Sequence, residues 1–112
     1  MPNTTNYKRG DVVLLPFPFS DQSSAKIRPA VIVSSEYPSD DLLVVAVTSV
    51  GDPLRPGEFA IKFWREVGLI HPSFAKRAVA SVTSELVRRQ LGRLRATDLA
   101  RLDESLSLWF GL

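Results

Sequence analysis

The chain contains no cysteine among its 112 residues, and this absence excludes several kinds of chemistry. Without thiols there is no disulfide framework, no cysteine nucleophile and no thiolate metal site. Only one histidine, His71, is present, so a histidine-rich metal centre is excluded as well. We therefore expect no metal and no other cofactor, and a fold that depends on its hydrophobic core.

Long apolar runs are also missing. No stretch approaches the ~20 residues needed to span a bilayer, and the polar residues 1–6 do not resemble a signal peptide. Hydrophobic residues make up 45% and charged residues 23%, which is ordinary for a globular protein. We expect a soluble protein of the cytoplasm, with a flexible N-terminus at residues 1–6 and a single domain at residues 7–112.

The formal net charge of +2 hides an uneven distribution. Residues 76–101 carry seven basic side chains against two acidic ones, and six of the seven are arginine. Arginine is the side chain best suited to forked contacts with phosphate. The stretch is therefore typical of a surface that faces a polyanion, although the solvated face of a small protein explains it equally well.

Most of the chain has the pattern of short strands separated by turns. The runs 29–35 and 42–48 are apolar on both faces, which is typical of central, buried strands. Pro16 and Pro18 cannot donate to a sheet, so the strand before them must end there or lie at an edge. The expected strands are residues 12–15, 29–35, 42–48, 59–64, 78–83 and 87–94, the last with an irregularity at Gly92.

The end of the chain has a helical period. Thr97 is the expected N-cap, with Asp98 in the first turn. Apolar residues then recur at helical spacing, at Leu99, Leu102, Leu106 and Trp109. Five to seven short strands followed by one helix predict a mainly β fold, a small antiparallel barrel with a C-terminal helix.

Arg28 stands immediately before Pro29, at the entrance to an apolar strand. Proline disfavours the helical conformation in the residue before it, so we expect Arg28 to be extended. A long cation on a stiff point of the backbone suits a pre-positioned anion site. An ordinary arginine at the edge of a strand fits the same pattern.

Thr48 and Ser49 follow the wholly apolar run 42–47 and precede Gly51. Hydroxyls at that position can donate to a phosphate oxygen without competing against the hydrogen bonds of the sheet. Threonine is also common in strands and serine in turns, so the pair alone does not establish a site.

Taken in order, several segments resemble the PemK/MazF family of toxin endoribonucleases. They are RGDVV at residues 9–13, PFPFSD at 16–21, KIRPAVIVS at 26–34, TS at 48–49 and LVRRQLGRL at 86–94. The closing helix is similar too, so the resemblance covers almost the whole chain. It implies a CcdB/PemK-type fold, which is an SH3-like barrel with a C-terminal helix.

The resemblance also implies a function. Members of this family are homodimeric toxins of type II toxin–antitoxin systems, and they act as mRNA interferases. They cleave single-stranded RNA at short sequences without metal, by attack of a 2′-hydroxyl that leaves a cyclic phosphate. The expected partner is a cognate antitoxin with an acidic, poorly ordered tail. The implied catalytic residues are Arg28 and Thr48, and the implied substrate-binding residues are Ser49, Asp21, Phe19, Lys26 and Arg77.

The chemistry of these side chains limits their roles. An arginine stays protonated at any working pH, so we expect Arg28 to stabilise charge and Thr48 to act as a hydrogen-bond donor. Some relatives carry an acidic residue near the segment 76–79, where this chain has Arg77, so the general base is unassigned. His71 is the remaining candidate for acid–base work, but it lies in a turn-like segment without an obvious partner.

Aromatic side chains offer two interpretations. Phe17, Phe19, Trp64 and Phe74 could stack on bases, or they could belong to the core or to a dimer interface. Trp109 and Phe110 are expected to be packing residues of the helix.

Two other functions stay open. An inhibitor resembling the gyrase poisons that share this barrel would act through its C-terminal helix, without Arg28 or Thr48. A catalytically silent module, inactive because of the departure at Arg77, would still bind RNA or its antitoxin.

Overall fold

The computed structural model describes residues 7–17, 26–34 and 40–112. The expected flexible N-terminus at residues 1–6 and the predicted substrate-binding residues Phe19 and Asp21 lie outside these ranges. Within the described ranges, no helix has the length and apolar character needed to cross a membrane.

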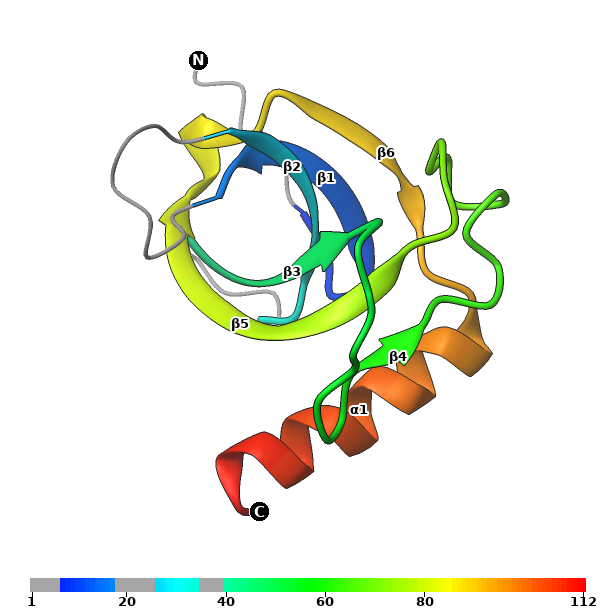
Figure 1. Ribbon diagram of the computed structural model, residues 1–112. Helices are drawn as coiled ribbons and strands as arrows, with labels where there is room; N and C mark the ends of the chain where they lie inside the picture. The colour runs from blue at the N-terminus through cyan, green and yellow to red at the C-terminus, as the bar shows by residue number, and fades with distance from the viewer. Residues whose placement is uncertain (1–6, 18–25, 35–39) are drawn as a thin grey trace.

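Six strands form one antiparallel sheet in the order β4-β5-β3-β2-β1-β6. Figure 1 shows the sheet curling round on itself, with the helix lying outside the curl beneath β5 and β4. This arrangement confirms the predicted mainly β fold with a C-terminal helix. The elements are β1 (Asp11–Pro16), β2 (Ile27–Ile32), β3 (Asp41–Thr48), β4 (Phe59–Ala60), β5 (Phe74–Thr83), a 3-10 helix (Ser84–Leu86), β6 (Arg89–Arg93) and α1 (Ala96–Phe110).

The two central strands explain the apolar runs of the sequence. Successive side chains of a strand point to opposite faces of the sheet, and both faces of β2 and β3 are covered. On one face, Val31 and Val45 join a core that also contains Leu102 of α1. On the other face, inside the curl, Ile32 and Val44 belong to a second core. Continuous apolar sequence is therefore what these positions require.

The expected strand at residues 59–64 is wrong beyond its first two residues. Only Phe59–Ala60 pairs, as the short edge strand β4, and the chain then turns through residues 62–68. The cause lies in the helix. The buried carboxylate of Asp98 accepts the backbone N–H groups of Lys62 and Phe63, at 2.9 and 3.0 Å, which directs these amides away from any strand partner.

The helix begins two residues earlier than predicted. Arg95, not Thr97, is the N-cap residue, and its carbonyl accepts the N–H of Leu99 at 2.9 Å. Asp98 lies in the first turn as expected, but its carboxylate holds the 62–63 turn. The helix ends at Gly111, whose φ of 71° is the left-handed conformation that glycine adopts without strain.

The predicted irregularity at Gly92 is confirmed. The pairing of β1 with β6 shifts by one residue between Val12, which faces Gly92, and Val13, which faces Gln90. A Cβ atom on Gly92 would lie 2.7 Å from the carbonyl oxygen of Val67, so only glycine fits where the two backbones approach.

Candidate functional site

Arg28 lies in β2, the strand at which the sequence placed it. It is the second residue of the strand, half-buried, and it pairs with Leu15 of β1. Its neighbour Pro29 pairs with Leu14 in the same ladder, so the extended conformation expected before proline is confirmed. The arginine side chain therefore extends from a backbone that is fixed on both sides of the residue.

Thr48 is the last residue of β3, the strand next to β2. The ladder between the two strands pairs Ala30 with Ala46. The paired part of this ladder ends there, and Arg28 and Thr48 each lie two residues beyond that pair, on the neighbouring strands. Because side chains two residues apart share a face, both belong to the face lined by Ala30 and Ala46. The topology thus brings the two predicted catalytic residues to the same end of the same sheet face.

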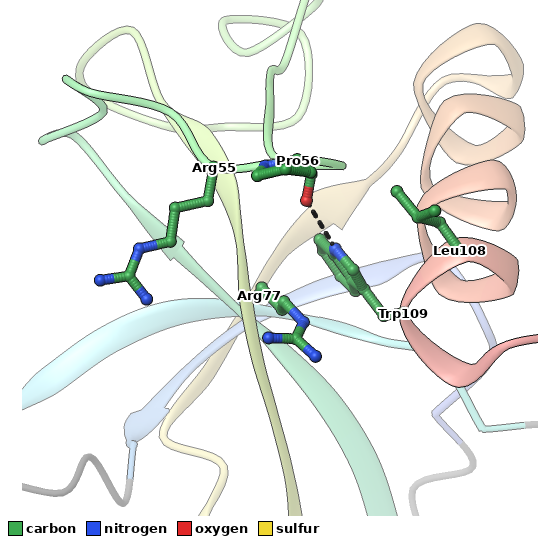
Figure 2. A pocket seen from close by; sticks show the side chains of 5 residues that line it. All are labelled: Arg55, Pro56, Arg77, Leu108 and Trp109. Atoms are coloured by element: carbon green, nitrogen blue, oxygen red, sulfur yellow. Dashed lines mark hydrogen bonds between the residues drawn. The ribbon is translucent and has the colours of Figure 1, made fainter.

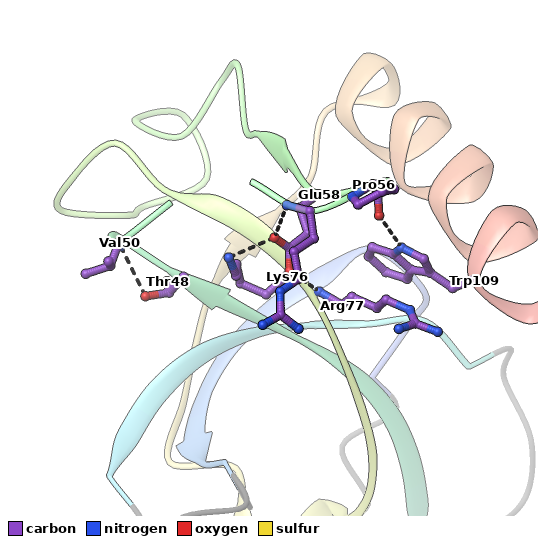
Figure 3. Close-up of polar contacts among 8 residues, drawn as sticks. Thr48, Val50, Pro56, Glu58, Lys76, Arg77 and Trp109 are labelled. Atoms are coloured by element: carbon purple, nitrogen blue, oxygen red, sulfur yellow. Dashed lines mark hydrogen bonds and ion pairs between the residues drawn. The ribbon is translucent and has the colours of Figure 1, made fainter. Parts of the chain in front are cut away.

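The hydroxyl of Thr48 is oriented by its own turn. Its Oγ1 accepts the N–H of Val50 at 3.2 Å, the local contact of a threonine that closes a turn (Figure 3). A hydroxyl that accepts one hydrogen bond keeps its own proton available for another acceptor. The adjacent Ser49 is exposed. The end of β3 therefore presents a positioned donor, with a second hydroxyl beside it.

Phe74 supports this turn from the neighbouring strand. It pairs with Thr48 across β3 and β5. A Cβ on Gly51 would lie 2.5 Å from the Phe74 ring, so the ring packs directly on the backbone of the turn. Of the aromatic residues considered as base platforms, Phe17 is 2% exposed and Trp64 packs against the helix-side core, so both are core residues. Phe74 is half-buried beside the site.

A buried carboxylate, Glu58, joins the loop before β4 to strand β5. Its side-chain oxygens accept the N–H of Arg55 at 2.8 Å, the ammonium of Lys76 at 2.8 Å and the N–H of Arg77 at 2.9 Å (Figure 3). The residue is 7% exposed. One side chain therefore fixes the backbone of two arginines that are 22 positions apart in the sequence.

These contacts determine the protonation of Glu58. Burial raises the pKa of the carboxyl, but hydrogen bonds from the Arg77 amide, the Lys76 ammonium and the Arg55 amide outweigh it, so the pKa lies below its ordinary value. A carboxylate stands beside Arg77, where relatives are expected to carry an acid. The carboxylate oxygens already accept three hydrogen bonds and the pKa is lowered, so Glu58 is not assigned as the general base.

A pocket of about 270 Å³ lies beside this carboxylate, between the loop and the end of α1. Figure 2 shows it lined by two arginines, a proline, a leucine and a tryptophan. The indole N–H of Trp109 donates to the carbonyl of Pro56 at 2.9 Å, which fixes the ring against the loop. The lining residues are Arg55, Pro56, Arg77, Leu108 and Trp109.

The remaining predicted residues are more scattered. Lys26 is exposed immediately before β2, and Arg77 is exposed on β5. His71 is exposed, and its backbone carbonyl accepts the hydroxyl of Ser73 at 2.7 Å. Trp109 packs against the helix-side core as expected, whereas Phe110 is 59% exposed and does not pack as predicted.

Two residues of the site were missed from the sequence, Glu58 and Arg55. The turn between them is a local feature of the chain. The N–H of Glu58 donates to the carbonyl of Arg55, and the N–H of Arg55 donates to the carboxylate of Glu58. The link from Glu58 to Lys76 and Arg77 depends on the pairing of distant segments and has no signature in the sequence.

One protein-family model matches this chain, and solved structures share its fold. The family model of the PemK-like, MazF-like toxin of type II toxin–antitoxin systems matches residues 8–110. A comparison with curated protein sequences gave no match.

Solved structures show the same fold at low sequence identity. MazF from Deinococcus radiodurans is 21% identical, with a TM-score of 0.78, 97% of this chain and 100% of that chain covered. An endoribonuclease from a mycobacterial species is 16% identical, with a TM-score of 0.77 and coverage of 99% and 97%. A mycobacterial endoribonuclease in complex with its cognate antitoxin is 17% identical, with a TM-score of 0.77 and coverage of 95% and 96%.

Proposed function

Because this chain belongs to the PemK-like, MazF-like toxins of type II toxin–antitoxin systems, we propose that it is a sequence-specific endoribonuclease that cleaves single-stranded RNA. The observation that carries the proposal is the position of Arg28 and Thr48 at the same end of one sheet face. A guanidinium and a free hydroxyl proton together make a donor set for a phosphate group that gathers negative charge.

In the proposed reaction, the 2′-oxygen of a ribose attacks the adjacent phosphorus. The new bond closes a cyclic phosphate, the bond from phosphorus to the 5′-oxygen of the next nucleotide breaks, and that oxygen takes up a proton. Arg28 stabilises the charge on the phosphate oxygens, and the hydroxyl of Thr48 donates a hydrogen bond to one of them without giving up its proton. The proton of the attacking hydroxyl leaves to an acceptor other than Arg28, whose guanidinium stays protonated.

The neighbouring groups suit a role in holding the substrate. Ser49 adds a second hydroxyl beside Thr48, and Lys26 and Arg77 add exposed cations. We include Phe19 and Asp21 in the same proposal from the sequence resemblance alone. None of these steps uses a metal ion, so cleavage is expected to persist in EDTA.

The test is direct. A defined RNA is incubated with the protein in EDTA, the cuts are mapped, and the new ends are tested for a cyclic phosphate. Arg28→Ala is expected to lower the single-turnover rate by about 10²-fold or more, as loss of a transition-state donor does. Arg89→Ala, an exposed arginine on the edge strand β6, is the control of equal charge. Intact RNA, or an Arg28→Ala protein that cuts as fast as the parent, would overturn the proposal.

We also propose that the chain forms a homodimer and binds a cognate antitoxin in the cytoplasm. The C-terminal end of the chain supports a dimer contact, because Phe110 is 59% exposed and Leu112 is 93% exposed. Light scattering after size exclusion tests the dimer. An antitoxin with an acidic tail is expected to compete with RNA for the basic site, and saturable binding of both together would contradict this.

A further inference from the structure

We propose that the pocket between the loop before β4 and the end of α1 binds one nucleotide of the RNA outside the scissile bond, with Arg55 and Arg77 on its phosphate, and that Glu58 is the positioning residue for both arginines. The inference rests on the proposed ribonuclease function and extends it to a second contact with the same substrate. It has four supports in the structure.

The first support is the state of the two guanidinium groups. Both arginines are exposed and line the pocket, with the guanidinium of Arg77 beside Trp109 and that of Arg55 directed away from the ring (Figure 2). In the part of the chain that the structure describes, the ion pairs join Arg9 to Asp103, Lys76 to Glu58, Arg93 to Asp11 and Arg101 to Glu104. Neither Arg55 nor Arg77 takes part in any of these pairs, so both forks are available for an anion, and phosphate matches their geometry.

The second support is the way in which Glu58 holds this pair. One carboxylate oxygen accepts the N–H of Arg55 and the other accepts the N–H of Arg77, so one side chain sets the separation of the two backbones. The ammonium of Lys76 lies 2.8 Å from the same carboxylate and balances its charge. The carboxylate can therefore position the arginines while the pocket keeps its positive charge (Figure 3).

The third support is the apolar wall opposite the arginines. Trp109, Leu108 and Pro56 form it, and the bond from the indole N–H to the Pro56 carbonyl holds the ring in one orientation (Figure 2). Gly57, with φ of 87°, lets the loop approach the helix, because a Cβ there would overlap the indole. The pocket volume of about 270 Å³ falls just below the range of about 300–1,000 Å³ typical of small-molecule sites, so the proposed occupant is no larger than a single nucleotide.

The fourth support is continuity with the proposed catalytic end. Arg77 lies three residues after Phe74 on β5, and Phe74 pairs with Thr48. Three residues of strand span about 10 Å, and the odd number places Arg77 on the helix side of the sheet, opposite to Phe74 and Thr48, so a nucleotide chain joining the two sites passes round the edge of the sheet at β4. A strand of RNA brings a phosphate at every nucleotide, and this repeat favours RNA over an acidic peptide as the occupant.

The first experiment measures binding without cleavage. A short RNA with a 2′-deoxy ribose at the mapped cleavage site cannot be cut, and fluorescence anisotropy gives its dissociation constant. Arg55→Ala and Arg77→Ala are each expected to weaken binding about five- to tenfold, as loss of a charge-assisted contact does. Arg89→Ala is the matched control and is expected to change it less than twofold.

The second experiment separates positioning from general stability. For cleavable RNA, Glu58→Gln is expected to raise KM about fivefold while kcat changes less than twofold, because Arg28 and Thr48 remain in place. In the Arg55→Ala/Arg77→Ala background the same change is expected to add nothing to KM. A purely structural role would lower kcat, or raise KM by the same factor, in both backgrounds, and would overturn the assignment of Glu58.

The remaining outcomes are distinct. Normal cleavage with unchanged binding by Arg55→Ala would overturn the pocket and leave the ribonuclease intact. Arginine-dependent binding by a protein that does not cut would overturn the ribonuclease and support the pocket. If Arg55→Ala instead dissociates a dimer or abolishes antitoxin binding, with RNA affinity unchanged, the pocket belongs to a second copy or a peptide, and the proposal is wrong.

Discussion

At the scale of single residues, the proposed role of Thr48 depends on its hydroxyl group and not on the shape of its side chain. Thr48→Val keeps the branched side chain and removes the proton donor, so we expect the single-turnover cleavage rate to fall about 10²–10³-fold. Thr48→Ser keeps the hydroxyl and is expected to retain most of the activity. Thr83→Val, at the exposed far end of β5, is the control. A Thr48→Val protein that cuts at the parental rate would remove the hydroxyl from the mechanism.

The lowered pKa of Glu58 leads to a prediction about the stability of the protein in acid. Its pKa is lowered in the folded protein, so its stabilising contribution is complete above the unfolded-state value of about 4.3 and is lost as the pH falls through the folded value. Glu58→Gln is therefore expected to lower the free energy of unfolding by about 2 kcal/mol at pH 7.

The difference between Glu58→Gln and the parent should shrink as the pH is lowered below about 4, because protonation removes the same charge from the parent. Urea unfolding at several pH values measures this. Glu104→Gln is the control, since its side chain is 74% exposed and its ion pair with Arg101 is a surface contact. A difference that stays constant with pH would contradict the assigned charge of Glu58.

At the scale of elements, the turn after β3 and the strand β5 depend on one another through Gly51 and Phe74. Gly51→Ala would force a Cβ to within 2.5 Å of the ring, so the ring or the turn must move. We expect a loss of about 1–3 kcal/mol of stability, as overpacking gives, and a slower cleavage step because Thr48 shifts with its turn.

A second substitution distinguishes this clash from other effects of alanine. Phe74→Ala makes room for the added Cβ, so Gly51→Ala should cost less stability in that background than in the parent. Urea unfolding of the four proteins completes the cycle. If the two effects simply add, the ring does not constrain the turn.

The elements that could be predicted from the sequence are those with local causes. Pro29 fixes the conformation of Arg28, and the apolar runs of β2 and β3 reflect burial on both faces. The end of β4 depends instead on Asp98, which reaches back 36 positions to the amide of Lys62. No local pattern reports such a contact, and the end of this strand was accordingly predicted wrongly.

The same distinction divides the candidate site. Arg28 and Thr48 could be proposed from the sequence because a motif of the resembled family carries each of them, and neighbouring strands place them at the same end of the sheet. Glu58 and Arg55 could not, because their importance arises only when the loop packs beside β5 and the end of α1. Fold topology, not composition, creates the pocket.

At the scale of the whole molecule, the basic stretch of residues 76–101 is less concentrated than its sequence suggests. It is divided among β5, β6 and α1. Several of its cations are paired with carboxylates: Lys76 with Glu58, Arg93 with Asp11 and Arg101 with Glu104. Arg95 lies over the ring of Phe63, 5.6 Å from its centroid. The sum of charge along the chain therefore overstates the surface available to a polyanion.

The salt dependence of RNA binding tests whether the RNA contacts the few cations of the assembled site or the whole basic stretch. Each phosphate contact on a single strand contributes about −0.7 to the slope of log affinity against log salt. Contacts by Lys26, Arg28, Arg55 and Arg77 alone predict a slope of about −3, whereas engagement of all seven basic groups of the stretch predicts about −5. Measured with uncleavable RNA, the slope should lose about 0.7 in Arg77→Ala and stay unchanged in Arg89→Ala. A steep slope that both variants reduce equally would mean that the RNA follows the general charge of the surface and not the assembled site.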